Sequence, residues 1–200
     1  MGFTTLIDII GSSIIGGFLL IILLQLNGKS TENTFTYSGE LTVQQNLVTV
    51  VQILEYDFRK IGYCADFKKI PKPHEAILFA DSNSIKFLTD VEPSDGTIDT
   101  MTYSLGPASE LSGTPNPRDR MLYRIINSEI PKEANLGVTE FKITYYNTLG
   151  HQLSFPVASP EEVYTLQIDV MVENPVAYDN KYSNAFWRQI RLAARNIRNR

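Results

Sequence analysis

Residues 9–26 read IIGSSIIGGFLLIILLQL and contain no charged side chain. Twelve of these 18 residues are Ile, Leu or Phe. As an α-helix they would extend about 27 Å, close to the ~30 Å hydrocarbon core of a bilayer. At roughly −0.3 to −0.6 kcal/mol each, the twelve apolar side chains favour insertion by about 4–7 kcal/mol. The sequence therefore predicts a transmembrane helix over residues 1–26, with the rest of the chain on one side of the membrane.

The small residues of this segment all lie in its first half. They are Gly11, Ser12, Ser13, Gly16 and Gly17. In lipid, where apolar burial gives no driving force between helices, small side chains let helix backbones approach closely. We therefore favour a helix-packing surface over the alternative, a lone lipid anchor that contains some glycine.

Asp8 stands at the head of the apolar segment. A carboxylate that faces lipid is costly and usually has a partner. Two interpretations stay open at this point: Asp8 lies in the headgroup layer, or it meets a cation of a neighbouring subunit, such as a free N-terminal amine.

The remaining residues have the composition of one folded domain. Of all 200 residues, 43% are hydrophobic and 20% are charged, and the lone cysteine, Cys64, excludes an internal disulfide. The net charge of −4 conceals an asymmetry, because residues 181–200 carry six cations and no acid. Within that segment, Arg188, Arg191, Arg195 and Arg198 recur at helical spacing. The spacing favours a basic amphipathic C-terminal helix, with a last strand over residues 186–192 as the alternative.

The order of local patterns predicts an α+β fold. Residues 27–39 are polar and indicate a linker or a loosened part of the helix, and residues 40–62 repeat apolar side chains every 3.6 positions, as an amphipathic helix does. Strands are expected at residues 76–80, 85–88, 97–105, 120–126, 138–147, 152–157 and 163–173. Short turns favour antiparallel pairing, so we expect a long N-terminal helix packed on an antiparallel β-sheet in a globular head, residues 40–200.

No catalytic or cofactor-binding pattern stands out. The sequence lacks a nucleophile elbow, a His-Glu-x-x-His pair and a Gly-x-Gly-x-x-Gly loop, so we expect no enzyme and no cofactor. A weak calcium candidate is the acidic loop around Gly96, formed by Asp90, Glu92, Asp95 and Asp99. Its spacing differs from the twelve-residue calcium loop, which favours a solvated turn and no metal. Few aromatic residues accompany the C-terminal arginines, so nucleic acid is not an expected partner.

Three short motifs accompany this architecture. They are the N-terminal Gly2-Phe3-Thr4-Thr5-Leu6-Ile7-Asp8, the run from Leu54 to Tyr63 with Arg59 ahead of Ile61-Gly62-Tyr63, and the segment from Gly137 to Phe141 followed by Tyr145-Tyr146-Asn147 and Gly150. With the apolar helix and the small sheet, they resemble bacterial type IV pilin-like proteins, most closely the minor pseudopilins and minor pilins. The resemblance covers the architecture of the whole chain.

The resemblance implies a structural subunit of a type IV pilus-like or type II secretion-like filament, or of its tip or initiation complex. Its partners would be copies of itself or related subunits, the inner membrane and the assembly machinery. The head would lie in the periplasm or at the cell surface.

The same resemblance implies roles for particular residues. Prepilin-type processing would cleave between Gly2 and Phe3, although no basic leader precedes Gly2 here, and the family's glutamate stands one position earlier than Asp8. The basic C-terminal residues, Arg188, Arg191, Arg195 and Arg198, would contact acidic neighbours, in a segment that the family often folds as a strand. The alternative function is a membrane-anchored extracytoplasmic binding module that forms no filament.

Overall fold

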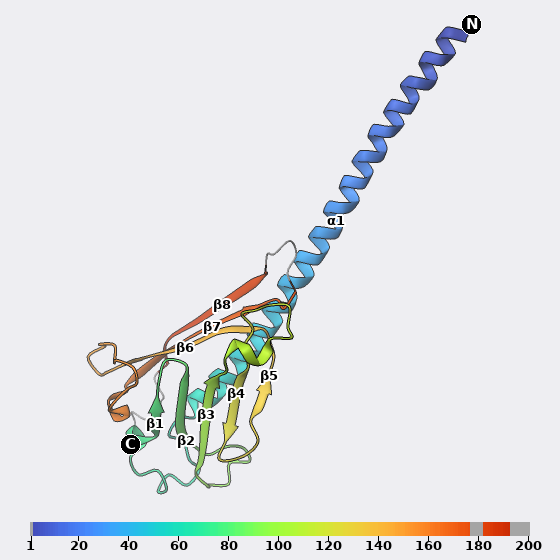
Figure 1. The fold of residues 1–200 in the computed structure, drawn as a ribbon. Helices are drawn as coiled ribbons and strands as arrows, with labels where there is room; N and C mark the ends of the chain where they lie inside the picture. The colour runs from blue at the N-terminus through green and yellow to red at the C-terminus, as the bar shows by residue number, and fades with distance from the viewer. Residues whose placement is uncertain (1, 177–181, 193–200) are drawn as a thin grey trace. The chain divides into compact units, whose positions relative to one another are not determined.

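The structure is a computed structural model that describes residues 2–176 and 182–192. Within them it has one α-helix, α1 (Gly2–Arg59), followed by eight strands in two antiparallel sheets (Figure 1). Short 3-10 turns at Pro73–Glu75, Ala108–Leu111 and Pro160–Glu162 interrupt the connections. The expected α+β fold, a long N-terminal helix with antiparallel strands packed on it, is confirmed.

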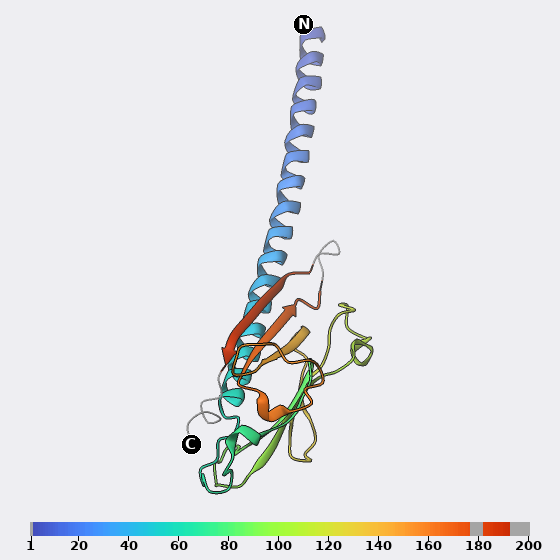
Figure 2. The same ribbon diagram turned by 90° about the vertical axis from the view of Figure 1, so that its left-hand side faces the viewer.

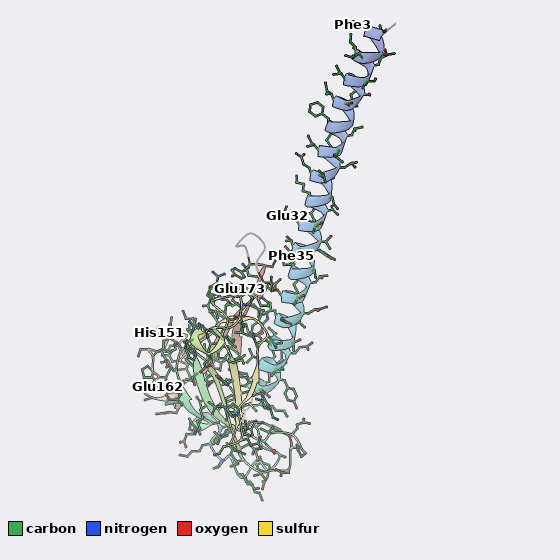
Figure 3. All side chains as sticks on the ribbon, turned by 45° about the vertical axis from the view of Figure 1, so that its right-hand side comes forward. Phe3, Glu32, Phe35, His151, Glu162 and Glu173 are labelled. Atoms are coloured by element: carbon green, nitrogen blue, oxygen red, sulfur yellow. The ribbon has the colours of Figure 1, made fainter. Side chains whose placement is uncertain are left out.

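The chain divides into two units, Met1–Gly39 and Glu40–Arg200, and α1 runs through both. Residues 27–39, which the sequence left as a linker or a loosened helix, are α-helical. In the first unit, the side chains of residues 2–26 project on all sides of the helix, from Phe3 onward (Figure 3). Phe3 is 78% exposed and Leu23 62%. This apolar segment therefore has no counterpart within its own unit that would cover it.

Five strands form the first sheet, in the order β1 (Ile77–Ala80), β2 (Ser84–Thr89), β3 (Asp99–Leu105), β4 (Leu122–Ile126) and β5 (Lys132–Ala134). The second sheet contains β6 (Val138–Tyr146), β7 (Thr165–Glu173) and β8 (Asn184–Leu192), which lie side by side in Figures 1 and 2. All neighbouring strands pair antiparallel. In the first sheet, Arg124 of β4 stands opposite Tyr103 of β3 on one side and Lys132 of β5 on the other.

The second half of α1 contributes one face to the core. Its buried side chains are spaced seven, four and four residues apart, which is one or two helical turns, so they share one face. They are Val43, Val50, Leu54 and Phe58. The Phe58 ring packs 5.6 Å from Phe87 and 5.5 Å from Tyr103, centroid to centroid. Tyr103 in turn lies 6.5 Å from Phe141 of the second sheet. One aromatic chain thus joins the helix to both sheets, and each ring contributes roughly 1.5–3 kcal/mol by leaving water.

Of the two C-terminal alternatives, the favoured basic helix is wrong where the structure describes it, and the last strand is confirmed. Residues 184–192 form strand β8, and the expected basic helix does not begin at Arg188. Exposure alternates along the strand, with Phe186 and Arg188 exposed and Ala185 and Trp187 half-buried. The reason is that β8 pairs with β7, which hydrogen-bonds the backbone N–H and C=O groups of both strands. The spacing of residues within the C-terminal segment does not show this partner. Arg195 and Arg198 lie outside the described residues.

Three smaller differences concern the strands. Residues 152–157 form no strand and contribute one isolated bridge, between Gln152 and Tyr146. Strand β5 was not expected, because its three residues carry no alternating pattern. The strands form two sheets and not one, since β5 pairs with β4 alone and β6 begins the second sheet. The helix was predicted to reach Gly62 but ends at Arg59. The chain then turns at Gly62, whose φ of +72° suits glycine.

Candidate functional site

The first candidate surface lies on the N-terminal segment of α1. Residues four apart are neighbours on a helix, so Asp8, Ser12 and Gly16 form one row. At 3.6 residues per turn, Ser13 lies about 60° and Gly17 about 100° around the axis from Gly16. Gly11 lies about 140° from Gly16 but about 60° from Asp8, so it flanks the row on one side while Ser13 and Gly17 flank it on the other.

The row is open to an approaching helix. A Cβ placed on Gly11, Gly16 or Gly17 would meet no described atom within 4 Å. The Ser12 hydroxyl donates to the Ile9 carbonyl at 2.9 Å, so it makes no demand for a partner outside its own helix. Asp8 is exposed, and no cation of residues 2–176 or 182–192 pairs with it. The expected partner, a cation of a neighbouring subunit such as a free N-terminal amine, belongs to another chain, so this contact stays a prediction.

Length and composition also fit a membrane span. Among the described residues, α1 is the one helix that is long and apolar enough to cross a bilayer, with a window of mean hydropathy 2.4 of which 0% is buried. Because the span is uncovered, it differs from the core helix of a soluble protein, which passes the same test while buried.

The C-terminal arginines are not a free basic surface where they are described. Arg188 donates from Nε to Asp169 Oδ1 at 2.7 Å and from Nη2 to Asp169 Oδ2 at 3.1 Å, across the β7–β8 pair. Its guanidinium also lies 5.3 Å from the Phe186 ring centroid. Because Arg188 already pairs with Asp169, it is not an unpaired cation for the expected contacts to neighbouring subunits. The side chain of Arg191 is not described.

The second candidate site is a buried polar cluster where α1 meets β3 and β4. Arg124 donates to Asp57 through Nε at 2.6 Å and through Nη2 at 3.1 Å, and the Tyr103 hydroxyl donates to the same carboxylate. The side chain of Asp57 is 2% exposed and that of Arg124 is 21% exposed. Burial, then the Asp57 charge, raises the pKa of Tyr103, and the hydrogen bond that Arg124 donates to Asp57 raises the pKa of Arg124. The cluster therefore holds one anion, one cation and a neutral phenol.

Two hollows flank this cluster. The larger, which we call the apolar groove, has a volume of about 590 Å³ and runs between residues 50–57 of α1 and strands β3 to β5. The smaller, which we call the polar hollow, has a volume of about 200 Å³ and is lined by Lys60, Thr89 and Glu92 among others. Four residues line both: Tyr56, Asp57, Arg124 and Lys132. The two hollows are consecutive parts of one helix–sheet boundary, apolar at one end and charged at the other.

The sequence did not reveal this cluster. Asp57 does interrupt the apolar repeat of α1, between Leu54 and Phe58, which is a local sign that a buried acid needs a partner. Its partner Arg124 is 67 residues away in the sequence, and no local pattern names it.

The acidic loop does not assemble a calcium site. Asp90 Oδ2 accepts the N–H groups of Ala65 at 2.9 Å and Gly96 at 3.0 Å, and Asp99 Oδ2 accepts that of Val91 at 3.0 Å. Asp95 caps the backbone of Thr97, while Glu92 turns to Tyr56 and Lys60, which hold its carboxyl pKa below the usual range. Within the described part of the chain, no three such side chains converge on a metal position. Three of the carboxylates thus accept backbone N–H groups and the fourth, Glu92, accepts from Tyr56 and Lys60, so all four fix the loop in place.

Two buried acids, Glu173 of strand β7 and Asp119, interact through their charges. Glu173 Oε2 accepts from Asn116 Nδ2 at 2.9 Å and from Arg118 Nε at 2.9 Å. Asp119 is 1% exposed, and neither of its carboxylate oxygens accepts a hydrogen bond from a described residue. The nearby Thr114 hydroxyl points to backbone carbonyls instead. Burial raises the pKa of Asp119, and the charge of Glu173 adds to the effect.

No known family model matches the sequence, and no curated protein matches it significantly. The function is therefore argued from the geometry of the chain itself.

Proposed function

We propose that this chain is a non-catalytic structural subunit of a membrane-assembled, pilin-like filament of the type IV pilus or type II secretion kind, or of its tip or initiation complex. The observation that carries the proposal is the continuity of α1 from Gly2 to Arg59. Its first part is apolar and exposed, whereas residues 43–58 present one buried face to two sheets. A helix with these two halves suits a subunit that is held in a membrane first and packs against other subunits later.

The proposed mechanism is association of N-terminal helices. The Asp8, Ser12 and Gly16 row offers a smooth surface on which a second helix backbone can approach closely, and such contacts rather than burial drive helix pairing in lipid. Head-to-tail contacts of this kind, repeated by a rotation that does not close, generate a helical filament. In this proposal the head lies outside the cytoplasm, in the periplasm or at the cell surface, and processing would occur between Gly2 and Phe3.

The test uses Gly16→Leu in the full chain. Leucine favours insertion by about 0.3–0.6 kcal/mol, so the variant should remain in the membrane. If the small row packs against another helix, the added side chain should reduce the filaments or subunit complexes that negative stain detects in membrane and shear fractions.

A matched control is Ile14→Phe, which adds bulk about 160° around the helix from Gly16. It should leave assembly closer to that of the unmodified protein. Equal assembly by Gly16→Leu and the unmodified chain, at equal membrane abundance, contradicts the packing surface. Intact mass of the membrane protein tells whether Met1 and Gly2 are removed.

A second candidate function is favoured by a different observation. The apolar groove of the head is the kind of concave, mostly apolar site that small ligands occupy. A membrane-anchored binding module would keep this groove and form no filament. Membrane fractions that contain the protein as single molecules under all conditions would favour the module over the filament subunit.

A further inference from the structure

We propose that the head of this protein binds a single-chain carboxylate amphiphile, of the fatty-acid type, in the apolar groove, with the carboxylate at Lys132 and Arg124. The site is distinct from the N-terminal helix and does not depend on filament assembly. It belongs to the second unit of the chain, Glu40–Arg200.

The groove has the size and walls that an alkyl chain requires. Its volume of about 590 Å³ falls within the roughly 300–1,000 Å³ that small-molecule sites span. Its apolar walls come from α1, from β4 and from the segment that leads into β6, through Val50, Ile53, Leu122, Leu136 and Val138. Ile53 is 43% exposed although it faces this groove, so its apolar surface is not covered by the protein itself.

The polarity of the boundary changes along one direction. The residues of α1 that line the apolar groove run from Val50 to Asp57, and those that line the polar hollow run from Tyr56 to Lys60. Along β4, Leu122 lines the apolar groove and Arg124 stands where the two hollows meet. A molecule with an apolar tail and a polar head matches this order, because its tail would lie by Val50 and its head by Arg124.

The charge at the polar end selects an anion. Asp57 and Arg124 neutralise each other through two hydrogen bonds, and Lys60 pairs with Glu92 at 3.3 Å. Lys132 lines both hollows and is exposed, and among the side chains that the structure describes, which do not include that of Glu133, no carboxylate lies within ion-pair distance of it. The boundary therefore carries one uncompensated positive charge, where a carboxylate head would sit.

The same charge argues against one occupant from the chain itself. Residues 181–200 contain six cations and no acid, so this segment would bring further positive charge to Lys132 and Arg124. An anionic amphiphile instead compensates the charge and covers the apolar wall in one step.

The experiment is photo-crosslinking of the full-length protein in amphipol with a diazirine derivative of dodecanoate. Modified peptides are mapped by mass spectrometry. Unlabelled dodecanoate, dodecyltrimethylammonium and dodecanol then compete, so the three competitors share a chain and differ in the charge of the head. We expect modification at residues 50–57 or 132–138, competed best by dodecanoate.

Two variants separate the tail from the head. Lys132→Glu should weaken competition by dodecanoate about tenfold, since reversing one charge near the surface exchanges attraction for repulsion. Lys86→Glu is the matched control, because Lys86 is an exposed strand lysine that lines neither hollow. Ile53→Trp fills the groove at a half-exposed helix position and should remove modification of residues 132–138.

Several results would overturn the proposal. Modification confined to residues 9–26 would mean that the probe partitions along the apolar helix only. Equal competition by the anionic and cationic amphiphiles, or equal loss in Lys132→Glu and Lys86→Glu, would remove the role of the charge. No modification of the groove in single molecules would mean that it takes no amphiphile. Modification that disappears whenever complexes of the chain form would assign the groove to a second copy. None of these outcomes bears on the assembly of the N-terminal helices.

Discussion

Replacing Asp57 by Ala should destabilise the head by about 3 kcal/mol. Removing one partner of a buried ion pair costs roughly 3–5 kcal/mol, because the other charge is left without compensation. The Tyr103 hydroxyl, on a residue that is 1% exposed, would also lose its acceptor, which costs about 1–3 kcal/mol. We take the low end of the ion-pair range and add no separate cost for Tyr103, because the Arg124 side chain is 21% exposed and can turn toward water.

The assay is urea unfolding followed by the fluorescence of Trp187, the one tryptophan of the sequence, which lies in strand β8. Its signal reports the head, and the apolar helix contributes nothing to it. For a domain of this size, about 3 kcal/mol corresponds to a fall in melting temperature of roughly 6–12 °C. The matched control is Glu55→Ala, which removes an exposed ion pair with Arg59, of 3.5 Å, from the same helix. That change should cost less than about 0.5 kcal/mol.

A double replacement tests the physical reason. Asp57→Leu combined with Arg124→Met substitutes apolar side chains for the whole pair, which is often neutral or stabilising when packing is kept. The double variant should therefore be more stable than Asp57→Ala. If Asp57→Ala unfolds at the same urea concentration as Glu55→Ala, the buried pair does not hold α1 to the sheet and the reasoning is refuted.

Three further changes test other parts of the head. Gly137→Ala should cost about 3 kcal/mol in urea unfolding, and Gly150→Ala only about 1–2 kcal/mol. Both glycines have positive φ, of +71° and +79°, but only a Cβ on Gly137 would collide with the Glu173 carbonyl. Equal costs would exclude the collision. The raised pKa of Asp119 means that its ionised form is disfavoured in the folded state, so the free energy of unfolding should fall as pH rises from the ordinary value of 3.8 through the folded pKa, and Asp119→Asn should remove that fall; an unchanged pH profile would contradict the buried, unpaired carboxylate. Burial also raises the pKa of the Cys64 thiol, which is 1% exposed, so iodoacetamide should label it after unfolding in urea and not before; rapid labelling of the folded protein would contradict its burial.

The two halves of α1 were predictable because their signals are local. An uncharged apolar stretch of sufficient length and a 3.6-residue apolar repeat are both properties of neighbouring residues. The long strands followed for the same reason: in β6, Phe141 and Ile143 are buried while Lys142 between them is exposed. The division into two sheets was not predictable. It arises because β5 pairs with β4 and not with β6, and no local pattern shows which strands pair.

Strand β8 shows how a local signal misleads. Its arginines recur at helical spacing, yet Arg188 pairs with Asp169 on the adjacent strand, and pairing with β7 decides the backbone. The sequence did not predict the groove and its polar cluster for a related reason. Residues 50–57 of α1, Arg124 of β4 and Leu136 come from three parts of the chain, and their hollow exists only once these are packed.

The two acids within the apolar stretches of α1 should respond differently to substitution. An acid in apolar surroundings needs a compensating cation, and Asp57 finds one in Arg124 of its own chain. Asp8 meets no cation of the described residues, so in our proposal its compensation comes with assembly. Asp8→Ala should therefore leave the urea midpoint of Trp187 fluorescence unchanged and lower the yield of filaments or complexes. Asp57→Ala should lower the midpoint in every molecule, assembled or single. Loss of head stability in Asp8→Ala would place its partner within the folded chain and would contradict its role in assembly.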